Sequence, residues 1–344
     1  MKAAVLEGVG KLRFRDDYPV PQIGGTEVLI RVEACGLCAT DIKMYKGEYT
    51  GRLPVVAGHE FTGVVENIGG GVKNIRPGDR VVVDPNESCC ACADCKTARS
   101  TFCRDMAAYG VFTDGGFAQY AKADERGVYK IPDSLPPAAA CFVEPVSCAV
   151  RGIDRAHIKA GDTVAVLGAG TMGQLLIQLA ANSGAARVVS IDPLGWKLEL
   201  SKAHGATDTV DASATDTQAK VAEITGGRGA DVVFEAVGSV QAFETALALA
   251  ARGGTVVQFG FAPEGARAQI VPFEILSKEL TIAGSWLNPY TFERAIKALA
   301  SGIVTTQRLI TDRLPLGELE QGIQKAMRRP EGFIKAVVFP DLQE

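Results

Sequence analysis

Hydrophobic and polar positions follow two different patterns along the chain. Residues 1 to about 150 contain short runs rich in β-branched residues, broken by Gly, Pro and Asp, such as EVLIRVEACG, GVVENIGGGV and DRVVVDPN. Runs of this kind predict a β-rich region with many loops. From Gly161 onward, apolar strand-like runs alternate with helical stretches, as in TVAVLG, QLLIQLAANSG, RVVSID and ADVVFEAVG. That alternation predicts a parallel sheet with helices on both faces.

The end of the chain has a third pattern. After about Asn288, two amphipathic stretches, TFERAIKALASG and GELEQGIQKAM, precede a last strand-like run, FIKAVVF. A chain of 344 residues is longer than one hydrophobic core usually supports, so two domains are expected. We predict an α/β protein with a β-rich domain over residues 1–150. A doubly wound parallel-sheet domain is expected over residues 151–287.

Composition narrows the kind of partner. Apolar residues make up 47% of the chain and charged residues 22%, which is typical of a globular protein. The net charge of -4 gives no attraction to a phosphate backbone and argues against nucleic acid as a partner. No apolar run approaches the roughly 18 residues that span a bilayer, and the first residues lack the apolar region of a signal peptide. We therefore expect a cytoplasmic protein without a membrane segment that binds a small molecule.

A glycine-rich turn follows the strand-like run TVAVLG. Its pattern is GxGxxG, with glycines at Gly168, Gly170 and Gly173. The first glycine permits a tight turn, the second lets the backbone approach a pyrophosphate, and the third lets helix and strand pack closely. The following helix, beginning near Thr171 and Met172, would offer free N–H groups to the phosphates. The turn predicts a dinucleotide site; the alternative is a glycine-rich turn that binds nothing.

An acidic residue lies where the ribose of a dinucleotide would be. Asp192 ends the run RVVSID, 19 residues beyond Gly173, close to the spacing expected of a ribose-binding acid. A carboxylate there accepts hydrogen bonds from both ribose hydroxyls and repels a 2′-phosphate, so NAD is favoured over NADP. Lys197 weakens this preference, because a basic side chain accepts such a phosphate. The other predicted cofactor contacts are Val237, Gly238, Phe259 and Gly260.

Four of the nine cysteines are closely spaced. The pattern C-x2-C-x2-C-x7-C places them at Cys89, Cys92, Cys95 and Cys103, in a lobe of about residues 85–105. In a reducing compartment such thiolates are metal ligands rather than disulfides, and four of them leave no position for water on a zinc ion. We predict a structural zinc, with the Cys90 side chain pointing away. A nucleic-acid-binding zinc ribbon lacks a basic surface here, and an iron–sulfur centre lacks its usual spacings.

A second, open zinc site would need about three protein ligands and one position for water or substrate. The candidate ligands are Cys38 in CGLCATD, His59 and Glu60 in GHE, and Glu144 in FVEPVSC. Because these residues are scattered, ordinary packing is the alternative for each. His157 and His204 lie in polar stretches and are expected at the surface.

The order of the motifs resembles a known family. CGLCATD, GHEFTGVVENIGGGVKNIRPGDRVV, the four-Cys lobe, GGFAQY, EPVSCAV and GAGTMG together resemble the zinc-containing medium-chain dehydrogenases along essentially the whole chain. Within that family the chain is most similar to sorbitol and polyol dehydrogenases, with threonine dehydrogenases nearby. The resemblance implies a GroES-like catalytic domain made of residues 1–150 and 288–344, and a Rossmann NAD-binding domain over residues 151–287. It also implies a homo-oligomer, with a tetramer favoured over a dimer.

The resemblance also implies roles around a catalytic zinc. Cys38 and His59 match zinc ligands of the family, and Glu60 matches a ligand of sorbitol-type members. Glu144 falls where alcohol dehydrogenases of animals and yeast place a third Cys ligand. A Glu there is typical of the polyol and threonine branches, where it binds zinc or holds the bound water. Asp41 matches a carboxylate that orients the ligand His.

Further residues match a proton path and the cofactor. Thr40 matches the hydroxyl that passes the substrate proton towards the cofactor ribose. Lys43 departs from the family, because many members carry a His there that ends the relay, and Arg151 likewise replaces a frequent His. Lys335 sits where a basic residue often lies near the cofactor pyrophosphate. Zinc lowers the pKa of bound water from 15.7 to about 7, and a bound alcohol should respond similarly before hydride leaves for nicotinamide at the domain cleft.

Together these features predict an enzyme that oxidises a secondary hydroxyl of a polyol to a ketone with NAD and two zinc ions. The alternatives are an L-threonine 3-dehydrogenase, a general secondary alcohol dehydrogenase, and a quinone or enoyl reductase of the same fold without catalytic zinc. A zinc- and NAD-binding interaction protein without catalysis is the alternative outside enzymes. The residues expected to line the substrate pocket are Tyr109, Phe112, Trp286, Asn288 and Tyr290.

Overall fold

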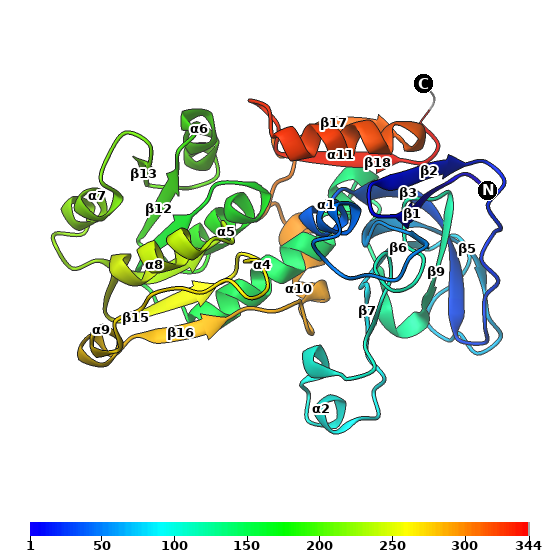
Figure 1. Ribbon diagram of the computed structural model, residues 1–344. Coiled ribbons are helices and arrows are strands. Elements are labelled where there is room, and N and C mark those ends of the chain that lie inside the picture. Colours follow the sequence, from blue (N-terminus) through cyan, green and yellow to red (C-terminus); the bar gives the residue numbers. More distant parts are fainter. Residues whose placement is uncertain (343–344) are drawn as a thin grey trace. The chain divides into compact units, whose positions relative to one another are not determined.

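The computed structural model describes residues 1–342 (Figure 1). Contacts among residues divide the chain into two compact units, one of Met1–Pro145 with Phe292–Glu344 and one of Val146–Thr291. The boundaries predicted from the sequence were residues 150 and 288. Residues 343–344, at the end of the predicted first domain, lie outside the described residues.

The first unit is built mainly from strands. They are β1 (Ala3–Gly8), β2 (Lys11–Arg15), β3 (Glu27–Gly36), β4 (Val55–Val56), β5 (Glu60–Ile68), β6 (Arg80–Val83), β7 (Asn86–Glu87), β8 (Ala107–Ala108), β9 (Tyr120–Asp124), β10 (Val128–Lys130), β17 (Ile310–Pro315) and β18 (Lys335–Phe339). One sheet has the order β10-β6-β5-β3-β18-β17, with β9 also paired to β3, and a smaller one has the order β2-β1-β4. In β3, buried and half-buried residues alternate, because successive side chains of a strand point to opposite faces. The predicted β-rich domain is therefore present.

Short helices surround these sheets. They are α1 (Ala39–Lys46), α2 (Ala93–Lys96), α3 (Pro137–Ala140), α10 (Phe292–Ala300) and α11 (Leu319–Arg328), the turns η1 (Ser100–Phe102), η2 (Glu125–Gly127) and η3 (Leu316–Glu318), and α4 (Val143–Ala156), which continues into the second unit. Helix α11 packs against β18 and α1. Ile30, Phe61 and Phe117 are fully buried in the core between these elements. The core fixes the ends of β3 and β5, where the candidate metal ligands begin.

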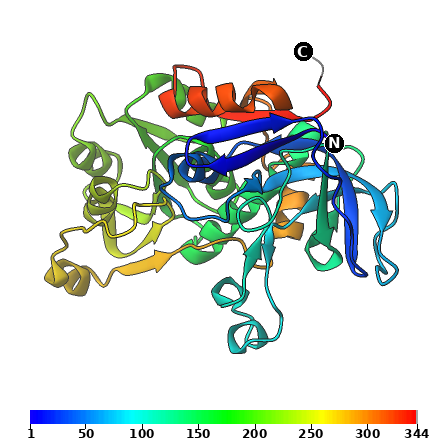
Figure 2. The same ribbon diagram turned by 45° about the vertical axis from the view of Figure 1, so that its right-hand side comes forward.

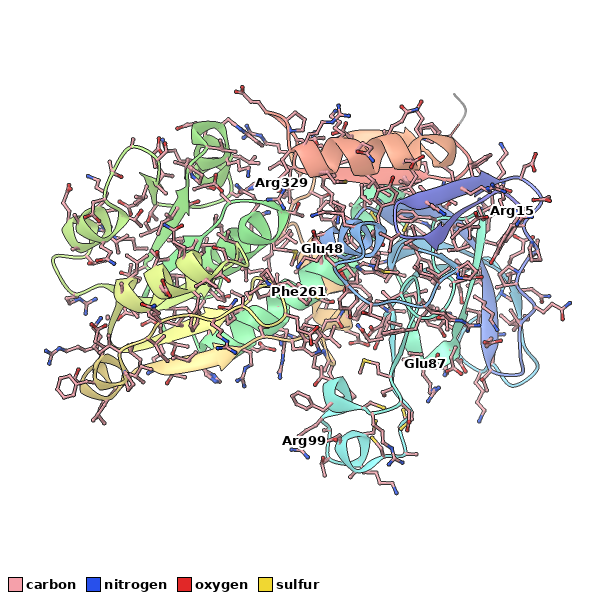
Figure 3. All side chains as sticks on the ribbon, in the orientation of Figure 1. Arg15, Glu48, Glu87, Arg99, Phe261 and Arg329 are labelled. Atoms are coloured by element: carbon pink, nitrogen blue, oxygen red, sulfur yellow. The ribbon has the colours of Figure 1, made fainter. Side chains whose placement is uncertain are left out.

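A lobe projects from the first unit between β7 and β8, which pair with each other at its base (Figure 2). It contains α2 and η1, and neither of these elements has a buried residue. Arg99, labelled in Figure 3, lies on this lobe and pairs with Asp94 at 2.8 Å. A segment with so little apolar burial needs another source of stability, such as a bound metal ion.

The second unit contains a six-stranded parallel sheet in the order β13-β12-β11-β14-β15-β16. Its strands are β11 (Thr163–Leu167), β12 (Arg187–Asp192), β13 (Asp208–Asp211), β14 (Ala230–Glu235), β15 (Ala250–Gln258) and β16 (Thr281–Gly284). Its remaining helices are α5 (Thr171–Ala181), α6 (Gly195–Ala203), α7 (Thr217–Ile224), α8 (Val240–Leu249) and α9 (Pro272–Lys278). All five residues of β11 are buried, as expected for a central parallel strand. The predicted α/β class with a Rossmann domain is confirmed.

Among the described residues, no helix has the length and apolarity needed to cross a membrane.

Candidate metal and cofactor sites

The start of helix α1 is tied to the loop before β5. The Asp41 carboxylate accepts hydrogen bonds from the backbone N–H groups of Cys38, at 2.8 Å, and Gly58, at 3.2 Å. Gly58 has a φ of 89°, and a Cβ there would lie 2.7 Å from Sγ of Cys35, so this position requires glycine. Asp41 therefore holds Cys38 beside the residues that follow Gly58, which are His59 and Glu60.

Cys38, His59 and Glu60 form the first candidate metal group. Each offers one ligand atom, and these atoms all lie within 4.8 Å of one another. Nδ1 of His59 lies 3.6 Å from Oδ1 of Asp41, which is suited to orienting the imidazole. Burial lowers the pKa of His59, but Cys38 and Asp41 raise it more, so it lies well above its usual value. The group favours a cation, and its sulfur, nitrogen and oxygen donors fit zinc.

Three other residues named from the sequence belong to this region: Glu144, Thr40 and Lys43. Glu144, in α4, is buried, but within the part of the chain that the structure describes it is not among the ligand atoms grouped with Cys38. Oγ1 of Thr40 lies 3.7 Å from Sγ of Cys38. Burial lowers the pKa of Lys43, against opposing effects of Glu48 and Cys38. The structure therefore groups Glu60, rather than Glu144, with Cys38.

Lys335, the predicted pyrophosphate contact, pairs with a carboxylate in this structure. Its Nζ forms an ion pair with Oε2 of Glu60, and both side chains are at least 95% buried. The same Nζ lies 5.7 Å from the centroid of the Phe142 ring. A buried ammonium needs an anionic partner and has one in Glu60. Sequence reasoning missed this pairing, although a charged residue inside the apolar run FIKAVVF was the available signal.

The four cysteines of the lobe form the second candidate metal group. Their Sγ atoms all lie within 4.8 Å of one another, and the residues are Cys89, Cys92, Cys95 and Cys103. Backbone N–H groups lower the pKa of Cys89 and lower that of Cys92 to about 6, whereas burial and the neighbouring thiols raise the pKa of Cys95. Four sulfurs gathered in this way are suitable ligands for zinc. Cys90 lies outside the group and is exposed, as expected.

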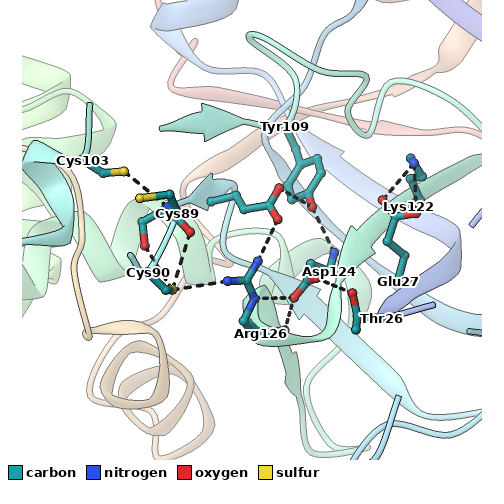
Figure 4. A network of polar contacts seen from close by, with 11 residues as sticks. Thr26, Glu27, Cys89, Cys90, Cys103, Tyr109, Lys122, Asp124 and Arg126 are labelled. Carbon is teal, nitrogen blue, oxygen red and sulfur yellow. Dashed lines mark hydrogen bonds and ion pairs between the residues drawn. The ribbon is translucent and has the colours of Figure 1, made fainter. Parts of the chain in front are cut away.

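A network of polar contacts attaches the base of the lobe to the sheet (Figure 4). The guanidinium of Arg126 donates to Glu87 at 3.1 Å, Asp124 at 2.7 Å and Sγ of Cys90 at 3.3 Å. The hydroxyl of Tyr109 donates to Glu87 at 3.1 Å and accepts the backbone N–H of Asp124 at 3.0 Å. Tyr109, predicted to line a substrate pocket, thus has its hydroxyl bonded in this network and its ring in the core.

The three glycines of the turn after β11 meet the predicted requirements. Gly168 has a φ of 93°, which a residue with a side chain rarely adopts. A Cβ at Gly170 would meet no atom within 4 Å, which leaves space for a ligand beside the backbone. A Cβ at Gly173 would overlap the carbonyl oxygen of Gly168, so close packing excludes a side chain there. The turn leads into α5, which begins at Thr171 and continues through Met172.

Asp192, at the end of β12, lies against this turn. Its Oδ2 accepts the backbone N–H of Ala169 at 2.8 Å, and its Oδ1 accepts that of Leu194 at 3.0 Å. Nζ of Lys197 lies 3.9 Å from Oδ2 and 5.6 Å from the centroid of the Trp196 ring. The carboxylate predicted to bind ribose is thus at the glycine turn, with a basic group beside it.

The loops after β14 and β15 are joined by Glu235, which sequence reasoning missed. Its Oε1 accepts the backbone N–H groups of Val237 and Gly238, both at 2.8 Å, and its side chain is fully buried. Its backbone carbonyl accepts the N–H groups of Phe259, at 3.0 Å, and Gly260, at 2.6 Å. Glu235 therefore brings together all four predicted cofactor residues of these loops. An acidic residue at the end of the apolar run ADVVFE was the signal in the sequence that could have indicated Glu235.

The residues predicted for the substrate pocket belong to both units, and each is described within its own unit. Phe112 is partly exposed, and Trp286 stacks on Phe261 with ring centroids 6.0 Å apart. Tyr290 is exposed. Asn288 is buried and donates through Nδ2 to Oγ of Ser147 at 2.7 Å.

The two remaining histidines differ from each other. His157 is exposed, as expected. The expectation was wrong for His204, which is buried with Nδ1 2.8 Å from Oε1 of Gln174. The polar residues next to His204 in the sequence suggested exposure, whereas the tertiary structure packs His204 against α5.

Family models match both units. Residues 24–133 match the alcohol dehydrogenase GroES-like domain, and residues 171–301 match the zinc-binding dehydrogenase domain. The chain is 33% identical to a sorbitol dehydrogenase of Bacillus subtilis, covering 99% of this chain and 98% of that protein. It is also 33% identical to an L-threonine 3-dehydrogenase of Bacillus velezensis, covering 89% of this chain and 90% of that protein.

A solved structure is similar over nearly the whole chain. A zinc-binding dehydrogenase from Sinorhizobium meliloti, bound to NADP, superposes with a TM-score of 0.95 and 39% identity, covering 98% of this chain and 99% of that one. The fold and both candidate sites thus define an oxidoreductase that binds zinc and a nicotinamide cofactor. The chain belongs to the medium-chain zinc-binding dehydrogenases, as its motifs predicted.

Proposed function

We propose that this dehydrogenase oxidises a secondary hydroxyl of a polyol to a ketone and transfers the hydride to NAD. The observation that carries the proposal is the group of Cys38, His59 and Glu60, tied together by Asp41 and able to hold a metal ion. The full-length similarity to a sorbitol dehydrogenase supports a polyol, and so does a Glu, rather than a Cys, at position 144. We further propose that the protein acts in the cytoplasm.

Each residue of the site would have a distinct role. Cys38 and His59, with Glu60 or Glu144, would hold the catalytic zinc, and the four cysteines of the lobe would hold the structural zinc. When bound, the catalytic zinc supplies Lewis acidity, which for water lowers the pKa from 15.7 to about 7. Asp41 orients His59, and the hydroxyl of Thr40 gives the substrate proton a path away from the metal group.

The cofactor would bind to the second unit. The turn of Gly168, Gly170 and Gly173 would receive the pyrophosphate, and Asp192 would bind the ribose hydroxyls. This carboxylate supports NAD, whereas Lys197 beside it at 3.9 Å would offer a 2′-phosphate one favourable contact. The related structure from Sinorhizobium meliloti was solved with NADP, so activity should be measured with both NAD and NADP.

Zinc analysis and activity measurements test the proposal together. We expect two zinc ions per chain, and reduction of NAD that depends on sorbitol, arabinitol or another sugar alcohol and stops when a chelator removes zinc. Threonine is a second candidate substrate, because an L-threonine 3-dehydrogenase is also 33% identical over 89% of this chain. 2-Butanol represents simple secondary alcohols. Absence of zinc would contradict the proposal. Binding of NADH without turnover of any alcohol would indicate an interaction protein instead.

We also propose that the protein forms a homo-oligomer, with a tetramer favoured over a dimer. Phe273 and Leu276, in α9, are 71% and 73% exposed, and the neighbouring strand β16 is at the edge of its sheet. Exposed apolar side chains beside an unpaired strand edge are typical of a surface that contacts another chain.

A further inference from the structure

A fully buried amide beside the glycine turn has no role in the proposed chemistry. It belongs to Gln174, in the first turn of α5. Its Nε2 lies 3.2 Å from the carbonyl oxygen of Ala169, 3.1 Å from that of Lys197 and 3.0 Å from Oγ of Ser201. Ala169 is part of the glycine turn, whereas Lys197 and Ser201 belong to α6. Gln174 therefore ties the turn that would receive the pyrophosphate to helix α6.

His204 fixes the orientation of this amide. The carbonyl oxygens of Ala169 and Lys197 can only accept hydrogen bonds, so the amide nitrogen of Gln174 must face them. Its Oε1 then faces Nδ1 of His204 at 2.8 Å, which requires that Nδ1 carries the hydrogen and donates it. With Oε1 held in this way, the N–H groups of the amide are directed at the turn and at α6. A buried amide satisfied at both ends is rigid.

The contacts of Gln174 close a ring through an ion pair. Oδ2 of Asp192 accepts the N–H of Ala169 at 2.8 Å and lies 3.9 Å from Nζ of Lys197. Gln174 binds the carbonyl oxygens of Ala169 and Lys197, so it links the backbone on both sides of this pair. The side chains of Asp192 and Lys197 are 7% and 16% exposed, so water screens their attraction only in part. The position of the ammonium thus depends on where Gln174 holds α6.

We propose that Gln174 is a positioning residue that determines cofactor specificity through Lys197. The inference rests on the proposed function, because it concerns a nicotinamide cofactor at the glycine turn. The carboxylate of Asp192 alone repels a 2′-phosphate, whereas an ammonium held 3.9 Å from it offsets its charge and offers the phosphate a contact. Gln174 keeps the ammonium at that place. The site therefore admits NADP beside NAD, and discriminates between them less than Asp192 alone would.

Fluorescence titration with NADH and NADPH measures the ratio of their dissociation constants, which a merely structural role of Gln174 would leave unchanged. Gln174→Met replaces the amide by an apolar chain of similar length. We expect it to raise the Kd of NADPH relative to that of NADH by about fivefold, the upper value for one ion pair that water reaches. Lys197→Ala should shift the ratio at least as far. Because both residues act through one contact, the double variant should shift it no further than Lys197→Ala alone.

Leu179→Ala is the matched control, because it removes a buried side chain from the same helix and lowers thermal stability by loss of packing. It should keep the native ratio. The proposal is wrong if Gln174→Met also keeps that ratio, or if its effect adds to that of Lys197→Ala. It is also wrong if the native protein binds NADH but not NADPH.

Gln174→Met leaves two buried carbonyl oxygens without their donor, and if it does not fold, Gln174→Asn decides. This variant keeps the amide but withdraws it by one methylene group, and the same direction of shift is expected. Alcohol-dependent reduction of the cofactor by the native protein is measured separately. The expected ratios without that activity would contradict the proposed function and leave the role of Gln174 standing. Turnover of a polyol with the native ratio in the Gln174 variants would do the reverse.

Discussion

His59 is the side chain on which the proposed metal chemistry depends most directly. We predict that His59→Ala or Cys38→Ser leaves one zinc ion per chain and lowers turnover at least about a thousandfold. The metal stabilises the transition state by several kcal/mol, and each 1.36 kcal/mol lost lowers the rate tenfold. Asp41→Asn should weaken zinc binding by about 10 to 100 times, because the imidazole is no longer oriented. Zinc analysis measures the metal content of each of these variants, and fluorescence titration measures NADH binding, which should stay unchanged. Loss of zinc and NADH binding together would indicate misfolding instead.

Asp192 determines, in our proposal, which nicotinamide cofactor is used. Asp192→Ala should weaken NAD binding by about tenfold, the value of one hydrogen bond to a charged group, and should relax the rejection of NADP. Because Asp192 also accepts two backbone N–H groups, thermal unfolding of the variant must be measured alongside. Lys197→Ala is the matched variant and should weaken NADP more than NAD. A native protein that already prefers NADP would contradict this interpretation of Asp192.

The residues predicted well from the sequence are those whose partners are close along the chain. The spacing of Cys89, Cys92, Cys95 and Cys103 by itself restricts them to one loop, and the structure groups their sulfurs. Lys335 meets Glu60 from 275 residues away, and no local pattern indicates such a partner. The buried hydrogen bonds of Asn288 and Tyr109 were not predicted either, because an aromatic or amide side chain suits a pocket and a buried hydrogen bond equally well.

At the scale of elements, the lobe between β7 and β8 is the segment that we expect to depend on a metal ion. Its helical turns bury no residue, so a bound zinc would replace the missing core. We predict that Cys103→Ala removes one of two zinc ions and makes residues 85–105 sensitive to limited proteolysis. Cys90→Ala is the control, because Cys90 is outside the metal group, and it should keep both ions and resist cleavage. Equal sensitivity of the two variants would show that the lobe does not need the metal.

Strands and helices with a strong periodic pattern were predictable, but some boundaries were not. The run AFETALALAARGG has no break in its small and apolar residues before the glycines, yet α8 ends at Leu249 and β15 begins at Ala250. Ala250 pairs with Ala230 of β14, and after a shift of register the pairing resumes at Thr255, so the partner strand decides where the helix stops. Strands β7 and β8, of two residues each, have no pattern of their own and form because they pair across the base of the lobe.

At the scale of the whole molecule, the first unit is assembled from both ends of the chain. Strands β17 and β18 come from the last 35 residues and extend the sheet next to β3, whereas the second unit is one continuous segment. The change of pattern at Gly161 predicted two domains from physical reasoning alone. That the last strands return to the first domain was supplied by family resemblance, since pairing across such a distance leaves no signal in periodicity.

The proposed oligomer can be tested at the surface formed by α9 and β16. Phe273 and Leu276 expose most of their side chains there, and burying such groups against a second chain would contribute about 1.5–3 kcal/mol each. We predict that Phe273→Glu combined with Leu276→Glu converts the oligomer to a smaller species by light scattering, because association would bury both carboxylates. Phe102→Glu is the control, since Phe102 is 62% exposed on the lobe and should leave the mass unchanged. If instead Phe102→Glu alone dissociates the protein, the lobe rather than the sheet edge carries the contact, and a monomeric native protein would refute the oligomer itself.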